Sequence, residues 1–368
     1  MNVPFLDLSR QNTEIRERAL AIFADIMERS SFIGGPYVKE FEESFAAFCQ
    51  VPHAIAVNSG TDALRLAIQA CGLEPGDEII TTPFTFIATS EAISQNQGVI
   101  RFADVHPDTC TLDPAALAAA ISPRTRGLIP VHLYGNPCHM REIMAIADKH
   151  GLWVVEDACQ AHGAAYDGSP VGSIGTAGTF SFYPTKNMGA FGEGGLVTTP
   201  REDILHKVLA LRNHGQSARY SHDFEGFNAR MDAVQAGVLH EKLKRLPDWN
   251  EQRRQMAVLY RQELAGIGDL EFFATTPGAT HVYHLFTVRT RQRDQLREYL
   301  TGQGIGSAVH YPVPLHLQPA YRPLGYGPGD FPVAEEYART VLSLPLYQGI
   351  REEEVRTVIH TIQAFFKH

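Results

Sequence analysis

The chain has no cluster of lysine and arginine residues, and its formal net charge is −9. Proteins that bind nucleic acid need grouped cations opposite the phosphates, so this composition argues against such a partner. The sequence also lacks an uninterrupted apolar run of about 18 residues, which a membrane-spanning helix requires. Its first residues, MNVPFLDLSRQ, show no basic segment followed by an apolar core, so neither export nor membrane insertion is expected.

Cysteine is sparse and unpatterned. The five cysteines are odd in number and show no CxxC spacing, so neither a disulfide framework nor a zinc knuckle is expected. A reducing cytoplasm fits this usage. A metal-dependent hydrolase built on some of the sixteen histidines is disfavoured because the chain has no HExxH motif, and the pair His310 and His316 brings no carboxylate with it. No metal site is therefore predicted.

What the sequence does contain is the alternation of short apolar runs and helical patterns that is typical of an α/β fold. With 368 residues, the chain is long enough for one large domain and a smaller one. We predict a doubly wound, mostly parallel central sheet between residue 53 and about residue 200. The predicted strands are 54–57, 78–82, 99–105, 126–133, 152–158, 174–183 and 194–199. The predicted helices between them are 62–73, 86–97, 114–121 and 139–150.

The pattern changes in the last third of the chain. A long helical region from 201 to about 266 is broken near Pro247. After it we predict strands at 283–290 and 307–312, helices at 292–302 and 351–366, and a loop rich in proline and glycine at 312–332. The interpretation is a large domain of residues 1–245 and a smaller α+β domain of residues 246–368.

Lysine is scarce as well, and one lysine has unusual neighbours. Lys186 lies in FSFYPTKNMGAFGEGG, among aromatic residues, proline and glycine. Apolar surroundings disfavour the charged ammonium, which makes a lysine nucleophilic toward aldehydes. The remaining six lysines lie in amphipathic stretches, where we expect each ammonium to face water: Lys39, Lys149, Lys207, Lys242, Lys244 and Lys367. A solvated loop lysine is the alternative interpretation of Lys186.

A carboxylate stands at the end of a predicted strand. Asp157 closes the run LWVVEDA, with Gln160 and His162 shortly after it. Ligands of open α/β sheets bind at the carboxyl ends of the strands. A carboxylate at that edge can keep a pyridine nitrogen protonated, as an electron-sink cofactor such as pyridoxal phosphate requires. The competing interpretation is a helix-capping aspartate.

Two further segments are typical of a site for such a cofactor. The turn Asn58-Ser59-Gly60-Thr61 joins a strand to a helix, and a helix amino terminus with a glycine and hydroxyl groups can hold a phosphate. Ser181 offers a second hydroxyl. Phe86 follows the strand 78–82, where an aromatic ring can stack on a flat cofactor. A plain capping turn and core packing are the alternative interpretations.

Six segments together resemble the DegT/DnrJ/EryC1/StrS family of sugar aminotransferases. They are VNSGTDAL, VVEDACQAHGA, FSFYPTKNMGAFGEGG, LRNHG, GFNARMDAVQAGVL and VHYPVPLHLQPAY, and the resemblance extends over essentially the whole chain. It implies a fold-type I pyridoxal phosphate (PLP) aminotransferase in which two identical subunits build each active site.

The resemblance also implies a role for individual residues. Lys186 would form the Schiff base with PLP and carry protons, and Asp157 would pair with the ring nitrogen. Gln160 would lie by the ring hydroxyl and Phe86 would stack on the ring. The phosphate would be held by Gly60, Thr61 and Ser181, and by Asn228 from the other subunit. The substrates would meet Arg230, His310 and Tyr311, with His316 as a less certain companion, and Arg212 and Arg219 are further cations for a sugar diphosphate.

The implied reaction is a ping-pong transamination. L-glutamate would donate the amino group and leave as 2-oxoglutarate, and a nucleotide-linked keto-sugar would accept the nitrogen. The motifs are most similar to members that aminate C3 of dTDP-3-keto-6-deoxyhexoses, with C3 amination of a UDP-linked 3-keto acetamido sugar as the alternative. A regulatory protein that binds ligand without turnover is a different class of function. A nicotinamide oxidoreductase is disfavoured, because Gly302, Gly304 and Gly306 follow a predicted helix rather than a strand.

Overall fold

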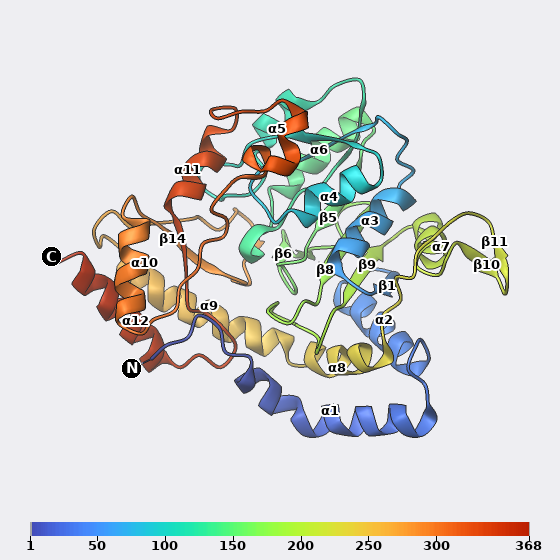
Figure 1. Ribbon diagram of the computed structural model, residues 1–368, viewed down its shortest axis with the longest axis horizontal. Helices are drawn as coiled ribbons and strands as arrows, with labels where there is room; N and C mark the ends of the chain where they lie inside the picture. Colours follow the sequence, from blue (N-terminus) through green and yellow to red (C-terminus); the bar gives the residue numbers. More distant parts are fainter. Residues whose placement is uncertain (1, 368) are drawn as a thin grey trace.

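The computed structural model describes residues 2–367, and a seven-stranded sheet forms its centre (Figure 1). The strand order is β1-β9-β8-β5-β4-β2-β3, and only β9 runs antiparallel to the others. The strands are β1 (His53–Val57), β2 (Glu78–Thr81), β3 (Val99–Phe102), β4 (Thr125–Leu128), β5 (Trp153–Asp157), β8 (Ala177–Ser181) and β9 (Gly195–Thr199). The predicted mostly parallel sheet is therefore confirmed.

Helices cover both faces of this sheet, because successive strand residues point to opposite sides and both sides are apolar. Val155 packs with α3 (Gly60–Ala70), α4 (Ala88–Gln95) and α7 (Glu202–Leu211), whereas Val154 packs with α5 (Pro114–Ala120) and α6 (Met140–His150). The latter face continues under α2 (Pro36–Phe48) and α8 (Ala233–Leu243). The doubly wound α/β architecture is thus built on two separate apolar layers.

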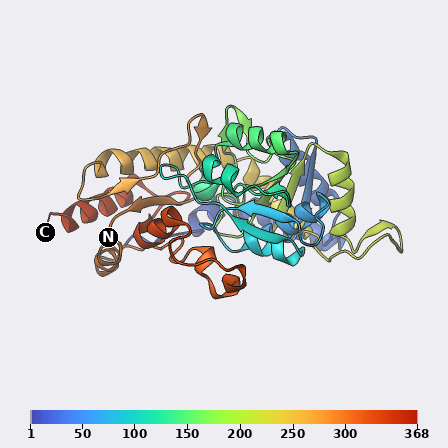
Figure 2. The same ribbon diagram turned by 90° about the horizontal axis from the view of Figure 1, so that it is seen from above.

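A second core lies beside the first at the carboxyl-terminal end of the chain (Figure 2). It surrounds the antiparallel sheet β12-β14-β15, made of Glu271–Phe272, Phe286–Arg289 and Val341–Leu344. Three helices pack on it, α9 (Leu246–Leu264), α10 (Arg293–Gly302) and α12 (Glu352–Phe365), together with Val3 from the start of the chain. The predicted domain boundary at residue 246 coincides with the first residue of α9, and the division into two domains stays a prediction.

The remaining elements join these two cores. The short helices η2 (Leu315–Leu317) and η3 (Pro319–Leu324), and α11 (Pro332–Thr340), return to the large core, where Tyr321 and Tyr337 are buried. The others are α1 (Ser9–Arg29), η1 (Leu133–Gly135), and three strands of a small sheet, β6 (Ala165–Tyr166), β7 (Ser169–Pro170) and β13 (Ala279–Thr280). No helix within residues 2–367 is both long and apolar enough to cross a membrane.

Two sequence predictions were wrong. The region 201–266 is not continuously helical, because the hairpin of β10 (Gln216–Ala218) and β11 (Ser221–His222) interrupts it and projects from the end of the molecule (Figures 1 and 2). The segment 307–312 is not a strand and makes only an isolated bridge from Ala308 to Ser343. Pro312 and Pro314 lack the backbone N–H groups that would extend this pairing. The predicted break near Pro247 is confirmed at the junction of α8 and α9.

Candidate active site

A cavity of about 660 Å³ opens at the carboxyl edge of the central sheet. Its lining comes from the ends of several strands, from the first turn of α3, and from Arg253, His284 and His310 of the smaller core. Nine residues predicted from the sequence line it: Gly60, Thr61, Phe86, Asp157, Gln160, Ser181, Lys186, His310 and Tyr311. Among these nine residues, Gly60 and Tyr311 are 251 positions apart in the sequence, and the fold brings them to one cavity.

Lys186 projects into this cavity from the connection between β8 and β9. Its backbone N–H donates to the carbonyl of Tyr183 at 2.9 Å, whereas its ammonium makes no hydrogen bond to any residue from 2 to 367. Burial lowers the pKa of Lys186, and the nearby Cys159 and Asp157 oppose this shift. A half-buried amine without a partner, poised to lose its proton, suits a nucleophile.

Asp157 is the last residue of β5, and its side chain is only 5% exposed. One carboxylate oxygen accepts from the Thr89 hydroxyl at 2.7 Å, and the other accepts from the backbone N–H of Cys159 at 3.2 Å. These two bonds fix the orientation of the carboxylate, and each oxygen keeps a further lone pair for a ligand. The carboxylate is therefore held rigidly in the cavity as an acceptor for a protonated ligand atom.

Gln160 connects the two sides of the cavity. Its side-chain oxygen accepts from the backbone N–H of Tyr134 at 2.8 Å, and its amide nitrogen donates to the Tyr311 hydroxyl at 3.3 Å. The Tyr134 hydroxyl in turn donates to the carbonyl of His310. Burial raises the pKa of Tyr311, so its hydroxyl stays protonated.

The first turn of α3 presents unpaired donors to the cavity. Ser59 caps this helix, since its hydroxyl accepts from the backbone N–H of Asp62 at 3.0 Å. The preceding N–H groups, of Gly60 and Thr61, have no acceptor among residues 2–367. Gly60 lies against β8 so closely that a Cβ atom there would be 2.5 Å from the Cβ of Ser181. This junction forms a cradle for an anion such as phosphate.

Phe86 is an exposed aromatic residue that lines the cavity. Its side chain is 55% exposed, and its ring centroid lies 6.3 Å from that of Tyr311. A large apolar ring left uncovered at the cavity is the arrangement expected of a stacking platform for a flat ligand.

Arg253, His284 and Thr89 were missed by the sequence analysis. Arg253 is 4% exposed, and its Nη1 donates to backbone carbonyls, including that of Leu346 at 3.0 Å. Burial lowers its pKa to about 10, which leaves it charged at neutral pH. No sequence signal marks Arg253, because it lies in an amphipathic helix where arginines usually face water.

His310 faces the cavity as a neutral imidazole. Burial and the nearby Lys186 lower its pKa to about 4, and its Nδ1 lies 2.9 Å from the Ser343 hydroxyl. A neutral histidine at this position can exchange hydrogen bonds with sugar hydroxyls without adding charge.

Other predicted residues lie outside this cavity. Asn228 is exposed, and Arg230 donates to the side chain of Asn213 at 2.5 Å. The role at a partner's site that was predicted for Asn228 stays a prediction. Arg212 was a wrong candidate for a diphosphate cation, because it is paired with Glu42 at 2.6 Å inside the chain.

Two more predicted residues, His316 and Arg219, also lie outside the cavity. His316 was also wrong as a cavity residue, since it is buried against Glu335 at 3.1 Å. Arg219 lies on the exposed hairpin with its guanidinium 5.2 Å from the Tyr220 ring, away from the cavity lining.

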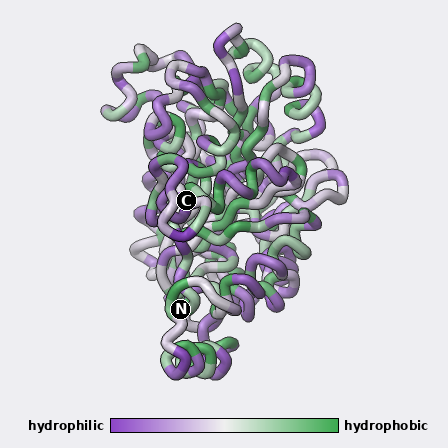
Figure 3. Tube along the Cα trace, turned by 90° about the vertical axis from the view of Figure 1, so that its right-hand side faces the viewer, coloured by the Kyte–Doolittle hydropathy of each residue, from purple (hydrophilic) through white to green (hydrophobic). Residues whose placement is uncertain are grey.

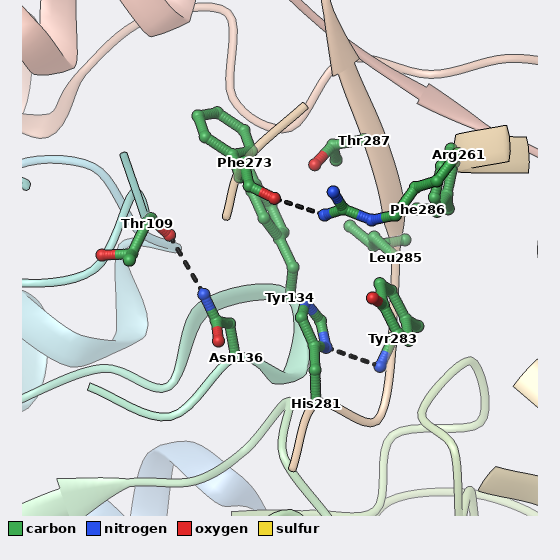
Figure 4. A pocket seen from close by; sticks show the side chains of 10 residues that line it. All are labelled: Thr109, Tyr134, Asn136, Arg261, Phe273, His281, Tyr283, Leu285, Phe286 and Thr287. Atoms are coloured by element: carbon green, nitrogen blue, oxygen red, sulfur yellow. Dashed lines mark hydrogen bonds between the residues drawn. The ribbon is translucent and has the colours of Figure 1, made fainter. Parts of the chain in front are cut away.

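Figure 4 shows a smaller pocket near the far side of Tyr134. The Asn136 amide donates to the carbonyl of Thr109 at 3.3 Å, the backbone N–H of Tyr283 donates to His281 Nδ1 at 2.9 Å, and Arg261 donates to the carbonyl of Phe273. Its volume of about 10 Å³ fits one water molecule, so it is not a substrate site.

The large cavity fits PLP residue by residue. The free N–H groups of Gly60 and Thr61 suit its phosphate, the Asp157 carboxylate suits its ring nitrogen, and the unpaired amine of Lys186 suits its aldehyde. Among residues 2–367, no group of three or more histidine, cysteine, aspartate or glutamate side chains is arranged to hold a metal ion.

Comparison with known proteins agrees with this geometry. The profile of the DegT/DnrJ/EryC1/StrS aminotransferase family matches residues 13–363. The chain is 44% identical to a pleiotropic regulatory protein of Geobacillus stearothermophilus, with all of both chains covered. It is also 44% identical to a dTDP-3-amino-3,4,6-trideoxy-alpha-D-glucose transaminase of Streptomyces venezuelae, covering 98% of this chain and 95% of the relative.

A third relative carries a different nucleotide in its name. The chain is 41% identical to a UDP-N-acetyl-3-dehydro-alpha-D-glucosamine 3-aminotransferase of Acidithiobacillus ferrooxidans, covering 98% of this chain and 97% of the relative. Among solved structures, DesV of S. venezuelae with a ketimine intermediate superimposes with a TM-score of 0.98 at 43% identity, covering 100% and 99% of the two chains.

Proposed function

The chain belongs to the DegT/DnrJ/EryC1/StrS aminotransferase family, and we propose that it transfers the amino group of L-glutamate to C3 of a dTDP-3-keto-6-deoxyhexose. The family is PLP-dependent, and PLP is the cofactor of this enzyme. The observation that carries the proposal is the amine of Lys186, which is unpaired, half-buried and opposite Asp157 in a cavity large enough for cofactor and sugar together.

Five residues of the cavity have a definite task in this proposal. Bound PLP acts as an electron sink that stabilises negative charge on the carbon losing its proton. Asp157 keeps the ring nitrogen protonated, and Gly60, Thr61 and Ser181 hold the phosphate. Lys186 Nζ removes a proton from the donor carbon and returns one to the cofactor side, for which its lowered pKa suits it.

The two substrates use the same cavity in turn. Both bring negative charge, as carboxylates or as a diphosphate, and the charged guanidinium of Arg253 lines the cavity to meet it. His310 and Tyr311 add neutral hydrogen-bonding groups to the lining, and we assign the sugar to them. L-glutamate therefore reacts first and departs as 2-oxoglutarate before the keto-sugar enters.

The second candidate substrate is a UDP-linked 3-keto acetamido sugar. The relative from A. ferrooxidans, named for a substrate of this type, supports it at 41% identity. Both candidates place the nitrogen on C3. They differ in the nucleotide and in the substituent on C2, and the sugar in that relative's name also lacks the 6-deoxy group of the first candidate.

A regulatory protein without turnover is the other class of function, and the name of the Geobacillus relative supports it. The intact set of Lys186, Asp157 and the phosphate cradle argues for turnover, because ligand binding alone does not need an amine of lowered pKa.

We also propose a homodimer with shared active sites. Helix α1, whose coil lies at the lower edge of Figure 3, carries both hydrophilic and hydrophobic residues. Three of its apolar side chains are exposed: Leu20 is 60% exposed, Phe23 45% and Met27 51%. Apolar surface of this extent favours burial against another chain. Asn228 and Arg230 are near the base of the projecting hairpin, and we propose that they contribute to the partner's cavity. The five free cysteines support the proposed cytoplasmic location.

The experiment that tests the proposal follows the nitrogen. The PLP-loaded enzyme is incubated with ¹⁵N-labelled L-glutamate and one nucleotide-linked 3-keto-sugar, in a separate reaction for each sugar. NMR then shows which carbon of the product carries the ¹⁵N. We expect ¹⁵N on C3 of the dTDP sugar, with none formed by Lys186→Ala and normal turnover by Lys149→Ala. Equal or faster turnover of the UDP sugar would move the assignment to the second candidate. No turnover of any keto-sugar by the loaded enzyme would support the regulatory alternative.

A further inference from the structure

Lys242 contradicts the prediction that every lysine other than Lys186 faces water. It lies on α8 and is 1% exposed. Its ammonium donates to the carbonyl of Gly189 at 2.6 Å, to the side-chain oxygen of Gln11 at 3.1 Å and to that of Asn12 at 3.4 Å. It also lies 4.9 Å from the centre of the Phe191 ring.

No carboxylate compensates this buried charge. Within residues 2–367, Lys242 makes no ion pair, and the charged groups on the elements around it are engaged elsewhere. Glu14 of α1 accepts from the Trp249 indole at 2.9 Å, while Glu241 of α8 is bound to Lys244 at 2.7 Å and to Arg18 at 3.5 Å. Lys186 and Glu193 are the charged residues of the neighbouring loop, and neither is paired with Lys242. Burial consequently lowers the pKa of Lys242 to about 8.

The bonds of Lys242 converge on the turn that carries Lys186. This turn closes tightly, since a Cβ atom on Gly189 would lie 2.2 Å from the carbonyl oxygen of Pro184. Lys186 is therefore enclosed by a turn of residues 184–189 whose last carbonyl is bound by Lys242. Gln11 strengthens the attachment, because its amide donates to the carbonyl of Asn187 at 3.1 Å while its oxygen accepts from Lys242.

The opposite side of the turn is attached separately. The Asn187 amide donates to the Asn250 side chain at 2.9 Å and to the carbonyl of Val282 at 3.0 Å. Lys242 and Gln11 thus supply the constraint from α8 and α1, and Asn250 supplies the constraint from α9. With both sets in place, the stretch that follows Lys186, residues 187–189, is attached to α1, α8 and α9.

We propose that Lys242 is a positioning residue that binds the turn 184–189 from α8 and thereby directs the amine of Lys186 into the cavity. The proposal rests on the function assigned to Lys186 above. A buried ammonium with only neutral acceptors is costly to a fold, so a purely structural site would be served better by an apolar side chain. An apolar side chain could not supply the hydrogen bonds that Lys242 donates to Gly189, Gln11 and Asn12.

The test compares Lys242→Met with Lys244→Met as the matched control, since Lys244 is an exposed lysine directly after the end of the same helix. Lys242→Met keeps an unbranched side chain that reaches as far as Cε and removes the ammonium with its donors. We expect amide hydrogen exchange in residues 183–191 to rise about tenfold or more, including the N–H groups of Lys186 and Ala190, which donate to Tyr183 and Phe182. Exchange in the strands of the central sheet should stay unchanged.

A second readout uses the cofactor. Borohydride trapping of PLP on Lys186, followed by mass spectrometry, should slow about tenfold in Lys242→Met. For the donor reaction, kcat should fall by a similar factor, while KM for L-glutamate changes less than about twofold. Gln11→Met, which removes the donor to Asn187, should reproduce both effects in weaker form and serves as the test if Lys242→Met does not fold.

Unchanged exchange at 183–191 in the folded variants, or a rise spread evenly over the whole chain, would overturn the proposal. Failure of the assigned function has a different signature. It would appear in the wild type, as trapping at another lysine or as no turnover, whereas the exchange experiment needs neither cofactor nor substrate.

Discussion

The substitution Gly60→Ala tests the phosphate cradle through a single methyl group. The new Cβ would lie 2.5 Å from the Cβ and 3.0 Å from the Cα of Ser181. Carbon atoms in contact normally stand about 3.5–4.0 Å apart, so about 1 Å of separation is missing. The obstructing atoms belong to or adjoin the backbone of β8, so no side-chain rotation relieves the contact. The first turn of α3 and the end of β8 must move apart.

The size of the effect follows from the bonds that this movement removes. A separation of about 1 Å takes one phosphate oxygen out of hydrogen-bond range of its N–H or hydroxyl partner. A hydrogen bond to a charged group contributes about 1.5–3 kcal/mol, which corresponds to a Kd for PLP raised about 10- to 150-fold. Overpacking also costs about 1–3 kcal/mol of stability, so folding has to be checked by circular dichroism.

The assay is an absorbance titration of the apoenzyme with PLP. Gly302→Ala is the control, because nothing lies within 4 Å of a Cβ at that position in α10. We expect an unchanged Kd for the control and the stated rise for Gly60→Ala. A folded Gly60→Ala protein that binds PLP as tightly as the wild type would refute the placement of the phosphate between α3 and β8.

Four further outcomes are expected. Asp157→Asn, which keeps the shape but removes the charge beside the ring nitrogen, should lower kcat about 100-fold or more while PLP still binds, as absorbance will report. Because burial lowers the pKa of Lys186, the pH at which apoenzyme reacts half-maximally with PLP should lie below the value of about 10.4 for an ordinary lysine, and a midpoint at or above it would contradict the assigned environment. Leu20→Asp combined with Phe23→Asp should give monomers in light scattering, against a dimer for the wild type. Mixing inactive Lys186→Ala and Asn228→Asp chains should restore about a quarter of wild-type activity if sites are shared, and none if each chain works alone.

The sequence was sufficient to predict the sheet and most of the cavity, for a physical reason. Parallel strands are read from their apolar runs, and their carboxyl ends meet at one edge, so the order of residues alone places Asp157 and Ser181 at that edge. The turn after β1 follows the same logic, because a strand that leads directly into a capped helix puts the helix amino terminus there as well.

What the sequence could not predict depends on contacts between distant segments. Lys242 and Arg253 lie in helices whose polar pattern looks solvent-facing, and only the packing of α1 on α8, and of α9 on the smaller sheet, buries them. The segment 307–312 has strand-like residues but no neighbour able to pair with it beyond Ala308. The predicted contact of Asn228 is harder still to infer from the sequence, because its partner lies on another chain.

The reversed strand β9 has a consequence for how this enzyme can vary. Because β9 returns antiparallel to β8, the connection between them, residues 182–194, begins and ends at the same edge of the sheet. A parallel successor would have required a crossover to the opposite edge before the chain could re-enter the sheet. Crossovers elsewhere can therefore gain or lose residues at a distance from the chemistry, whereas any insertion or deletion in residues 182–194 alters the cavity directly. Relatives that keep the same reaction are expected to differ in the length of this connection less than in the length of the crossovers.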